Sequence, residues 1–191
     1  MNIDWANPQV ITAAFVLAFI LVVGVAVYII HRRKTTAGLR KRFGSEYDRA
    51  VQEHGSERKA ETRLADRETR VDSLKIRDLT ATERLRFLAE WQTVQSRFVD
   101  HPKGAVTEAD ELVASLLQAR GYPVSSFDQR AADISVDHPG LMENYRSAHA
   151  IAVRGSEVEA TTEELRTAMI HYRAIFDELV QAPSVMEHRA A

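Results

Sequence analysis

The chain has 191 residues, a net charge of −2 and no cysteine. The absence of cysteine excludes a disulfide framework, a thiolate metal site and a cysteine nucleophile. Residues 32–42 carry six cations and Asp4 is the one charge before them, so residues 43–191 carry the −7 that the total requires. An acidic body of this kind argues against a nucleic-acid partner, because such binding depends on basic groups that neutralise phosphates.

Residues 10–30 form an apolar run with no charge and no proline. A helix of this length rises about 31 Å, close to the hydrocarbon thickness of a bilayer. A cleaved signal peptide is the alternative, but residues 1–9 contain Asp4 and no Lys or Arg, and the apolar run is too long. The sequence therefore predicts an uncleaved transmembrane helix at residues 10–30, after a short tail at residues 1–9.

The charges that flank this span are all on its C-terminal side. Before the span only the terminal amine is positive, so the positive-inside rule predicts a single-pass protein of the cell membrane with its N-terminus outside and its C-terminal domain in the cytoplasm. Setting this orientation is the first role of the basic residues, and attraction to anionic lipid at the membrane surface is the second. They are Arg32, Arg33, Lys34, Arg40, Lys41 and Arg42.

Residues 31–78 form a basic juxtamembrane segment and a charged helical spacer. Between residues 56 and 74 the helical pattern is charged nearly all round, although residues 60, 64, 67, 71 and 74 keep a coiled-coil spacing. Arg67 occupies one of those seam positions, and the register lasts barely two repeats. We favour a solvated spacer over one strand of a weak coiled coil.

Residues 79–182 predict an all-α helical bundle, followed by a loose tail at residues 183–191. Helices are expected from about Thr80, Gly104, Phe127, Pro139 and Thr161, each with an apolar stripe at helical spacing. Two starts have the capping-box spacing of Thr with Glu three residues later. No stretch alternates with the period of a strand. The fold class is therefore an N-terminal transmembrane helix, a charged helical spacer and a helical bundle.

Known catalytic signatures are missing from the sequence. The glycines are too far apart for a G-x-G or Walker-type phosphate loop, and neither G-x-S-x-G nor H-E-x-x-H occurs. The Glu-x-x-His pairs of di-iron bundles do not occur either. We expect no metal, no cofactor and no catalytic residue, and an enzyme is the less favoured class.

One short motif occurs twice. Val-Asp-His-Pro stands at residues 99–102 and again at residues 136–139, in each case before a predicted helix. An Asp–His pair could orient an imidazole for proton transfer. We favour the structural interpretation, in which Asp or His caps the helix and Pro opens it, because adjacent side chains seldom align and Pro explains the motif.

Tyrosines and histidines lie in or beside the apolar stripes of the last two helices. If these helices are neighbours, the residues could line a pocket for a small ligand, although a boundary histidine is more often a partner of a nearby carboxylate. The candidate ligand-binding residues are Trp91, Tyr122, His138, Tyr145, His149 and Tyr172.

Five segments carry a family resemblance: residues 39–51 (LRKRFGSEYDRAV), 91–100 (WQTVQSRFVD), 120–123 (RGYP), 136–139 (VDHP) and 171–173 (HYR). Together they resemble a bacterial protein family found especially in actinobacteria, whose single-pass membrane proteins have no assigned function. The resemblance covers nearly all of the chain after the anchor and implies no catalytic or binding residue.

The sequence thus predicts a cytoplasmic interaction or scaffold module held in the lipid bilayer through residues 10–30. We expect a protein partner, no nucleic acid, and homo-oligomerisation as a third hypothesis. The alternative is a small-ligand-binding or enzymatic helical domain with a Tyr/His-lined pocket. A ligand that raises the melting temperature would favour that alternative.

Overall fold

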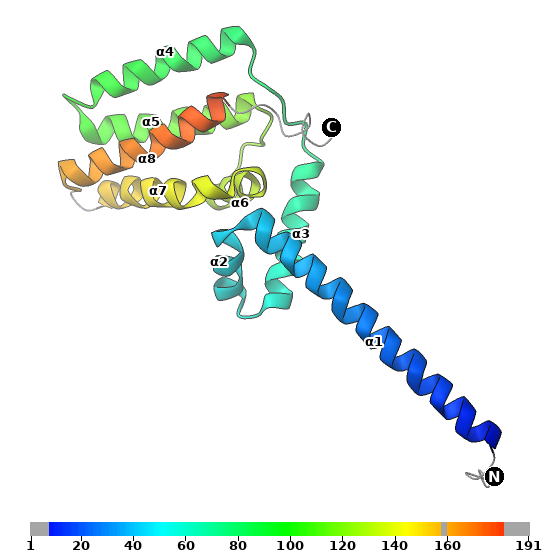
Figure 1. The fold of residues 1–191 in the computed structure, drawn as a ribbon. Helices are drawn as coiled ribbons and strands as arrows, with labels where there is room; N and C mark the ends of the chain where they lie inside the picture. The colour runs from blue at the N-terminus through cyan, green and yellow to red at the C-terminus, as the bar shows by residue number, and fades with distance from the viewer. Residues whose placement is uncertain (1–7, 158–159, 182–191) are drawn as a thin grey trace. The chain divides into compact units, whose positions relative to one another are not determined.

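The computed structural model describes residues 8–157 and 160–181, and in these residues all regular structure is helical (Figure 1). The predicted all-α class is therefore confirmed. The predicted tails at residues 1–9 and 183–191 lie largely or wholly outside the described residues. The helices are α1 (Pro8–Phe43), α2 (Ser45–His54), α3 (Glu57–Asp72), α4 (Ala81–Arg97), α5 (Pro102–Ala119), α6 (Phe127–Asp137), the 3-10 helix η1 (Pro139–Leu141), α7 (Met142–Glu157) and α8 (Thr162–Gln181).

The chain divides into two compact units, Met1–Arg42 and Phe43–Ala191. The first unit consists of α1, which is long and apolar enough to cross a membrane. Between Val16 and Ile30 its large apolar side chains are exposed. The helix is continuous through Gly38 and ends at Phe43, before Gly44, whose φ is +52°.

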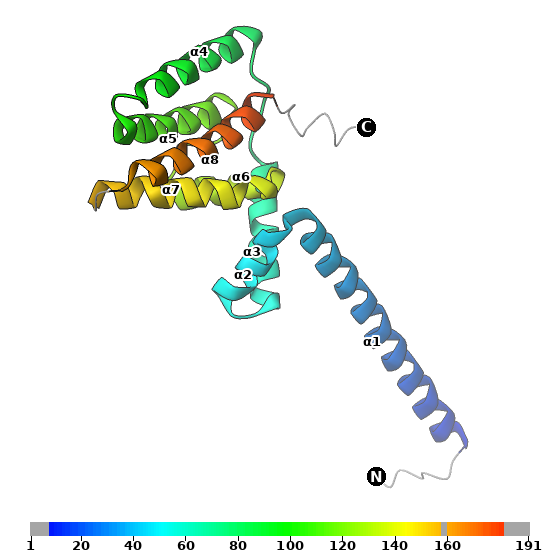
Figure 2. The ribbon, with the colours of Figure 1, turned by 60° about the vertical axis from the view of Figure 1, so that its left-hand side comes forward.

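In the second unit, α4, α5, α7 and α8 lie side by side around one apolar core (Figures 1 and 2). Each helix contributes the stripe that the sequence predicted, because residues three and four apart share one face of a helix. On α4, for example, Phe87, Trp91 and Val94 are buried. Trp91 stacks on Phe176 of α8 with the ring centroids 4.8 Å apart, which joins the first and last helices of the bundle.

Two of these helices begin with the predicted capping box. Thr80 Oγ1 accepts a hydrogen bond from the Glu83 N–H at 3.2 Å, and Glu83 Oε2 accepts one from the Thr80 N–H at 2.9 Å. Thr161 and Glu164 make the same reciprocal pair. The first four N–H groups of a helix have no intrahelical partner, and each box satisfies two such groups.

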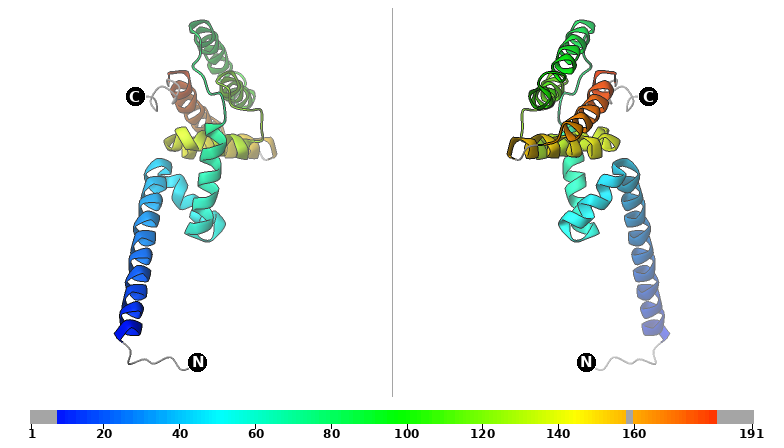
Figure 3. Two further views of the ribbon diagram at one scale, coloured as in Figure 1. Left: turned by 90° about the vertical axis from the view of Figure 1, so that its right-hand side faces the viewer. Right: turned by 90° about the vertical axis from the view of Figure 1, so that its left-hand side faces the viewer.

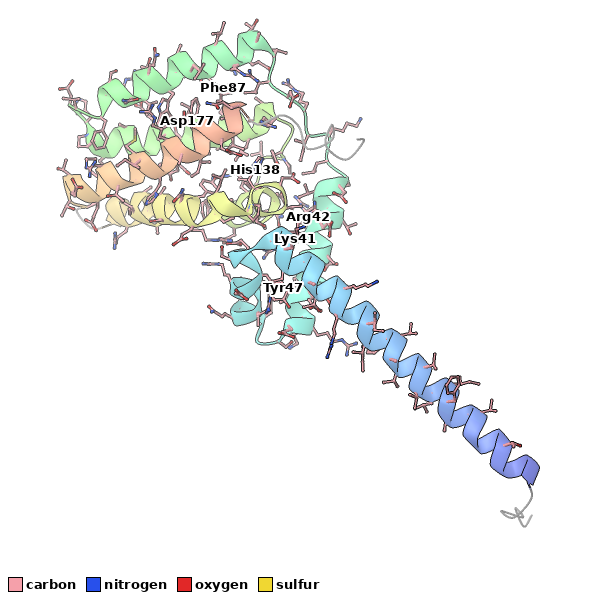
Figure 4. The ribbon with its side chains drawn as sticks, viewed as in Figure 1. Lys41, Arg42, Tyr47, Phe87, His138 and Asp177 are labelled. Carbon is pink, nitrogen blue, oxygen red and sulfur yellow. The ribbon has the colours of Figure 1, made fainter. Side chains whose placement is uncertain are left out.

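Helices α2 and α3 form a hairpin. Tyr47 of α2 is fully buried and its hydroxyl donates to Glu61 Oε1 of α3 at 3.1 Å (Figure 4). Ala60, Leu64 and Val71 of α3 are also buried. One face of α3 is therefore packed, which the favoured prediction of a solvated spacer did not include. The apolar residues of α3 are few, but their spacing puts them on one face that α2 and α6 cover.

Two charged contacts tie the hairpin to the bundle. Arg70 of α3 donates from Nε to Asp133 Oδ1 of α6 at 3.0 Å, and Asp133 is 1% exposed. Arg146 of α7 donates from Nη2 to Glu46 Oε2 of α2 at 2.7 Å. Figure 3 shows α3 reaching the layer that contains α6 and α7. The hairpin is therefore part of the same packed unit as the bundle.

The connection from α3 to α4 also lies against the bundle. The Arg77 N–H donates to the Arg120 carbonyl at the end of α5 at 2.9 Å. Gly121, which follows the C-cap of α5, has a φ of +96°, and an added Cβ would collide with the Lys75 carbonyl. Only glycine adopts this conformation without strain and lets the two backbones approach so closely.

Candidate functional site

The six candidate ligand-binding residues lie in three different environments. Tyr145, His149 and Tyr172 meet around Asp110, whereas Tyr122 and His138 lie beside Arg120. Trp91 belongs to the apolar core. Its indole Nε1 is buried without a hydrogen-bond partner, and its ring stacks on Phe176.

The Asp110 cluster consists of Asp110 of α5, Arg130 of α6, Tyr145 and His149 of α7, and Tyr172 of α8. The Tyr172 hydroxyl donates to Asp110 Oδ1 at 3.0 Å. His149 Nδ1 lies 3.8 Å from the same oxygen, and Arg130 Nη2 lies 3.9 Å from Asp110 Oδ2. One carboxylate therefore gathers side chains from three other helices.

Arg130 holds the other side of this cluster. Its Nε donates to the Tyr145 hydroxyl at 3.1 Å, and its Nη1 donates to the Ser125 carbonyl at 2.9 Å. Phe127, at the start of α6, stacks on the His149 imidazole with 3.6 Å between ring centroids and 5° between ring planes. The guanidinium and the aromatic ring fix the positions of Tyr145 and His149 from the α6 side.

Burial sets the protonation states in the Asp110 cluster. Desolvation lowers the pKa of His149 below its usual range, although the Asp110 carboxylate opposes this shift. Desolvation and Asp110 together raise the pKa of Tyr172 far above its usual range. Burial also raises the pKa of Tyr145, against Arg130. At neutral pH the cluster therefore holds two protonated phenols, of which Tyr172 donates to Asp110 and Tyr145 accepts from Arg130, and a neutral imidazole.

The Arg120 cluster lies at the C-terminal end of α5. Arg120 is 2% exposed, and its Nη1 donates to the Leu179 carbonyl of α8 at 2.6 Å. The Tyr122 hydroxyl is 3.4 Å from Asp137 Oδ2, and His138 Nδ1 is 3.5 Å from Glu178 Oε1. His138 marks the junction of α6 and α7 (Figure 4). Desolvation lowers the pKa of both Arg120 and His138. These contacts join the ends of three helices.

The two copies of the Val-Asp-His-Pro motif differ in their surroundings. Pro102 and Pro139 open helices, as the structural interpretation predicted. Neither His101 nor His138 caps through its side chain. His101 is exposed, while His138 is part of the Arg120 cluster. The motif is therefore a recurrent way to begin a helix after a turn.

His149 also lines an open groove of about 700 Å³ on the surface. Arg49 of α2 and Arg146 and Arg154 of α7 lie along this groove, together with Phe127 and Asp128. No group of three His, Asp or Glu side chains that could hold a metal ion occurs among the described residues. The groove presents guanidinium groups beside an aromatic stack.

No local pattern in the sequence points to Asp110, Arg130 or Arg120. A charged residue in a helical pattern is expected to face solvent. The hydrogen-bond partners of Asp110 and Arg120 lie far away in the sequence, as Tyr172 does from Asp110. Of the basic residues that follow the predicted span, Arg40, Lys41 and Arg42 lie in the last turn of α1 (Figure 4).

Comparisons of the chain with protein-family models, curated proteins and solved structures found no match.

Proposed function

We propose that this protein is a membrane-anchored helical interaction module, whose bundle binds a protein partner at the cytoplasmic face of the cell membrane. The observation that carries the proposal is the exposed apolar surface of α1 between Val16 and Ile30, which is followed directly by basic residues. Apolar side chains on all sides of one helix are stable in lipid, and cations mark its cytoplasmic end.

The packing of the second unit supports an interaction role for it. The Asp110 and Arg120 clusters use their charged and phenolic groups to bond one helix to another. Such groups hold a bundle in one arrangement, and a rigid helical surface is suited to a protein partner. The partner is expected in the same compartment as the bundle.

Arginine substitutions in the span test the anchor. Leu21→Arg with Val25→Arg puts two charges near the middle of the apolar stretch, at about 2.5–3.5 kcal/mol each. We expect the wild-type chain to resist alkaline extraction from membranes and this variant to be released. The control is Leu85→Arg with Val99→Arg, which adds the same charges at exposed positions of the bundle unit. Release of the wild-type chain would refute the anchor.

A small-ligand binder is the second candidate, and the groove beside His149 favours it. A compound with an anionic group and an aromatic ring would meet the guanidinium of Arg49 and the stacked Phe127. Phenyl phosphate is the probe. If this candidate holds, the probe raises the melting temperature of the full chain in detergent, and Arg49→Gln removes the rise.

A further inference from the structure

The charges of α3 are sorted by helix face. The helix carries five basic and five acidic side chains, so its net charge is zero. At 3.6 residues per turn, the acidic residues 57, 61, 68 and 72 fall within about 60° of one another, on one side of the buried stripe. On the other side a sector of about 80° holds the basic face, which we define as Lys59, Arg63, Arg67 and Arg70.

The basic face lines two adjoining hollows in the surface of the second unit. One, of about 390 Å³, lies between α3 and α6 and includes Arg67 and Arg70. The other, of about 650 Å³, includes Lys59 and also Arg58. They share His54 of α2, together with Arg63 and Asp66. Together they form one groove along α3, of a size that suits a phosphate-bearing group.

Most of the basic face has no acidic partner in the described part of the chain. Arg70 is paired with Asp133, but no carboxylate lies within 4.0 Å of Lys59, Arg63 or Arg67. Asp66 and Asp128 line the groove without pairing with these three cations. Elsewhere on the unit, exposed arginines such as Arg97 and Arg166 are paired with glutamates. The groove therefore keeps unneutralised positive charge on an otherwise acidic unit.

We propose that the basic face of α3 binds the phosphate groups of anionic phospholipids in the bilayer that holds α1. The inference rests on the proposed anchor. Residues 31–42 separate the span from the second unit, and they reach about 18 Å as a helix or about 40 Å fully extended. Basic residues near an anionic membrane surface are attracted to it, and the attraction grows with their number. Because the unit as a whole is acidic, charge favours contact through this face and disfavours the others.

A single cysteine on the groove reads out this contact in the full chain. Thr62 is exposed and lines the groove, and the chain has no other cysteine, so Thr62→Cys carries one fluorophore. The labelled chain is placed in nanodiscs of phosphatidylcholine alone or mixed with phosphatidylglycerol, with a nitroxide on some headgroups. We expect about twofold stronger quenching with phosphatidylglycerol, and a loss of the difference in high salt. Ser115→Cys on α5 is the control label and should show no difference.

Two triple variants with the same change of charge distinguish binding by the basic face from an attraction that depends only on the net charge of the unit. Lys59→Gln with Arg63→Gln and Arg67→Gln should remove the phosphatidylglycerol effect, with an unchanged circular dichroism spectrum. Arg84→Gln with Arg86→Gln and Arg173→Gln, at exposed positions elsewhere, should keep it. The basic residues that follow the span are present in both variants, so they cannot account for a difference.

The outcomes that contradict the inference are distinct. Equal quenching in both kinds of disc, or equal effects of the two variants, would overturn binding by the basic face while leaving the anchor intact. A response of the probe to inorganic phosphate in phosphatidylcholine discs would assign the groove to free phosphate and overturn the lipid assignment. A chain that does not enter discs would refute the anchor and this inference with it.

Discussion

Arg146 of α7 donates a hydrogen bond of 2.7 Å to Glu46 of α2, across a hundred residues of chain. Glu46 is 5% exposed, so its carboxylate is removed from water and depends on this partner. The contact therefore joins the α2–α3 hairpin to the bundle, and its removal tests whether the second unit unfolds as one.

Arg146→Met leaves the Glu46 carboxylate buried without its partner. Loss of one member of a buried pair is expected to cost about 2–4 kcal/mol of unfolding free energy. Denaturation of the full chain in detergent, followed by circular dichroism, measures the cost. Arg166→Met removes an arginine from an exposed pair on α8 and is the control. Equal effects of the two substitutions would show that the contact with Glu46 is not formed.

Gly121→Ala tests the contact between the α3–α4 connection and the end of α5. A positive φ disfavours alanine, and the new Cβ would meet the Lys75 carbonyl. We expect a loss of about 1–3 kcal/mol of unfolding free energy. Gly140→Ala is the matched control, since a Cβ there meets nothing within 4 Å and no positive φ occurs. If both variants unfold alike, the connection does not lie against the bundle.

Tyr172→Phe and Tyr122→Phe compare the two polar clusters. Tyr172 donates to Asp110 at 3.0 Å, whereas Tyr122 lies 3.4 Å from Asp137. A hydrogen bond to a charged group contributes about 1.5–3 kcal/mol, and a longer bond contributes less. Tyr172→Phe should therefore lower the unfolding free energy more than Tyr122→Phe does. The reverse order would contradict the geometry of the Asp110 cluster.

The stability of the second unit should fall in mild acid. Burial lowers the pKa of His149. The charged groups that face its imidazole are Asp110 of α5 and Arg130 and Asp128 of α6. The unfolded chain then takes up a proton more readily than the folded chain, so this contribution is complete above the unfolded pKa of about 6.5. It is lost as the pH falls from there through the folded pKa.

His138 has a pKa shifted in the same direction, with Glu178, Asp137 and Arg120 around it. Unfolding free energies of the wild type and of His149→Gln, measured between about pH 5 and pH 7, check the prediction. The wild type should lose stability more steeply than the variant. Parallel curves would show that His149 is not the group that responds.

The sequence predicted the helices well because local signals define them. Thr80 with Glu83 marks one start, Gly121 marks one stop, and the spacing of Phe87, Trp91 and Val94 fixes which face is buried. These signals act within a few residues, so they need no knowledge of neighbours in space.

The polar clusters could not be predicted in this way. The hydrogen bond of Tyr172 to Asp110 spans 62 residues, and the hydrogen bond of Arg120 to the Leu179 carbonyl spans 59. Nothing local distinguishes such charges from solvated ones. The packing of the α2–α3 hairpin was not predicted either. Three small or aliphatic residues on α3 are enough to bury one face of that helix when α2 and α6 cover it.

The most direct test of the account is the side of the membrane on which the bundle lies. Ser115→Cys gives one exposed thiol on α5, and Asn2→Cys places one thiol before the apolar run in the sequence. Each variant is treated in intact cells with a maleimide that does not cross the inner membrane. We predict that Asn2→Cys is labelled in intact cells and that Ser115→Cys is labelled only after lysis. Labelling of Ser115→Cys in intact cells would contradict the cytoplasmic interaction module and place its partner outside the cytoplasm.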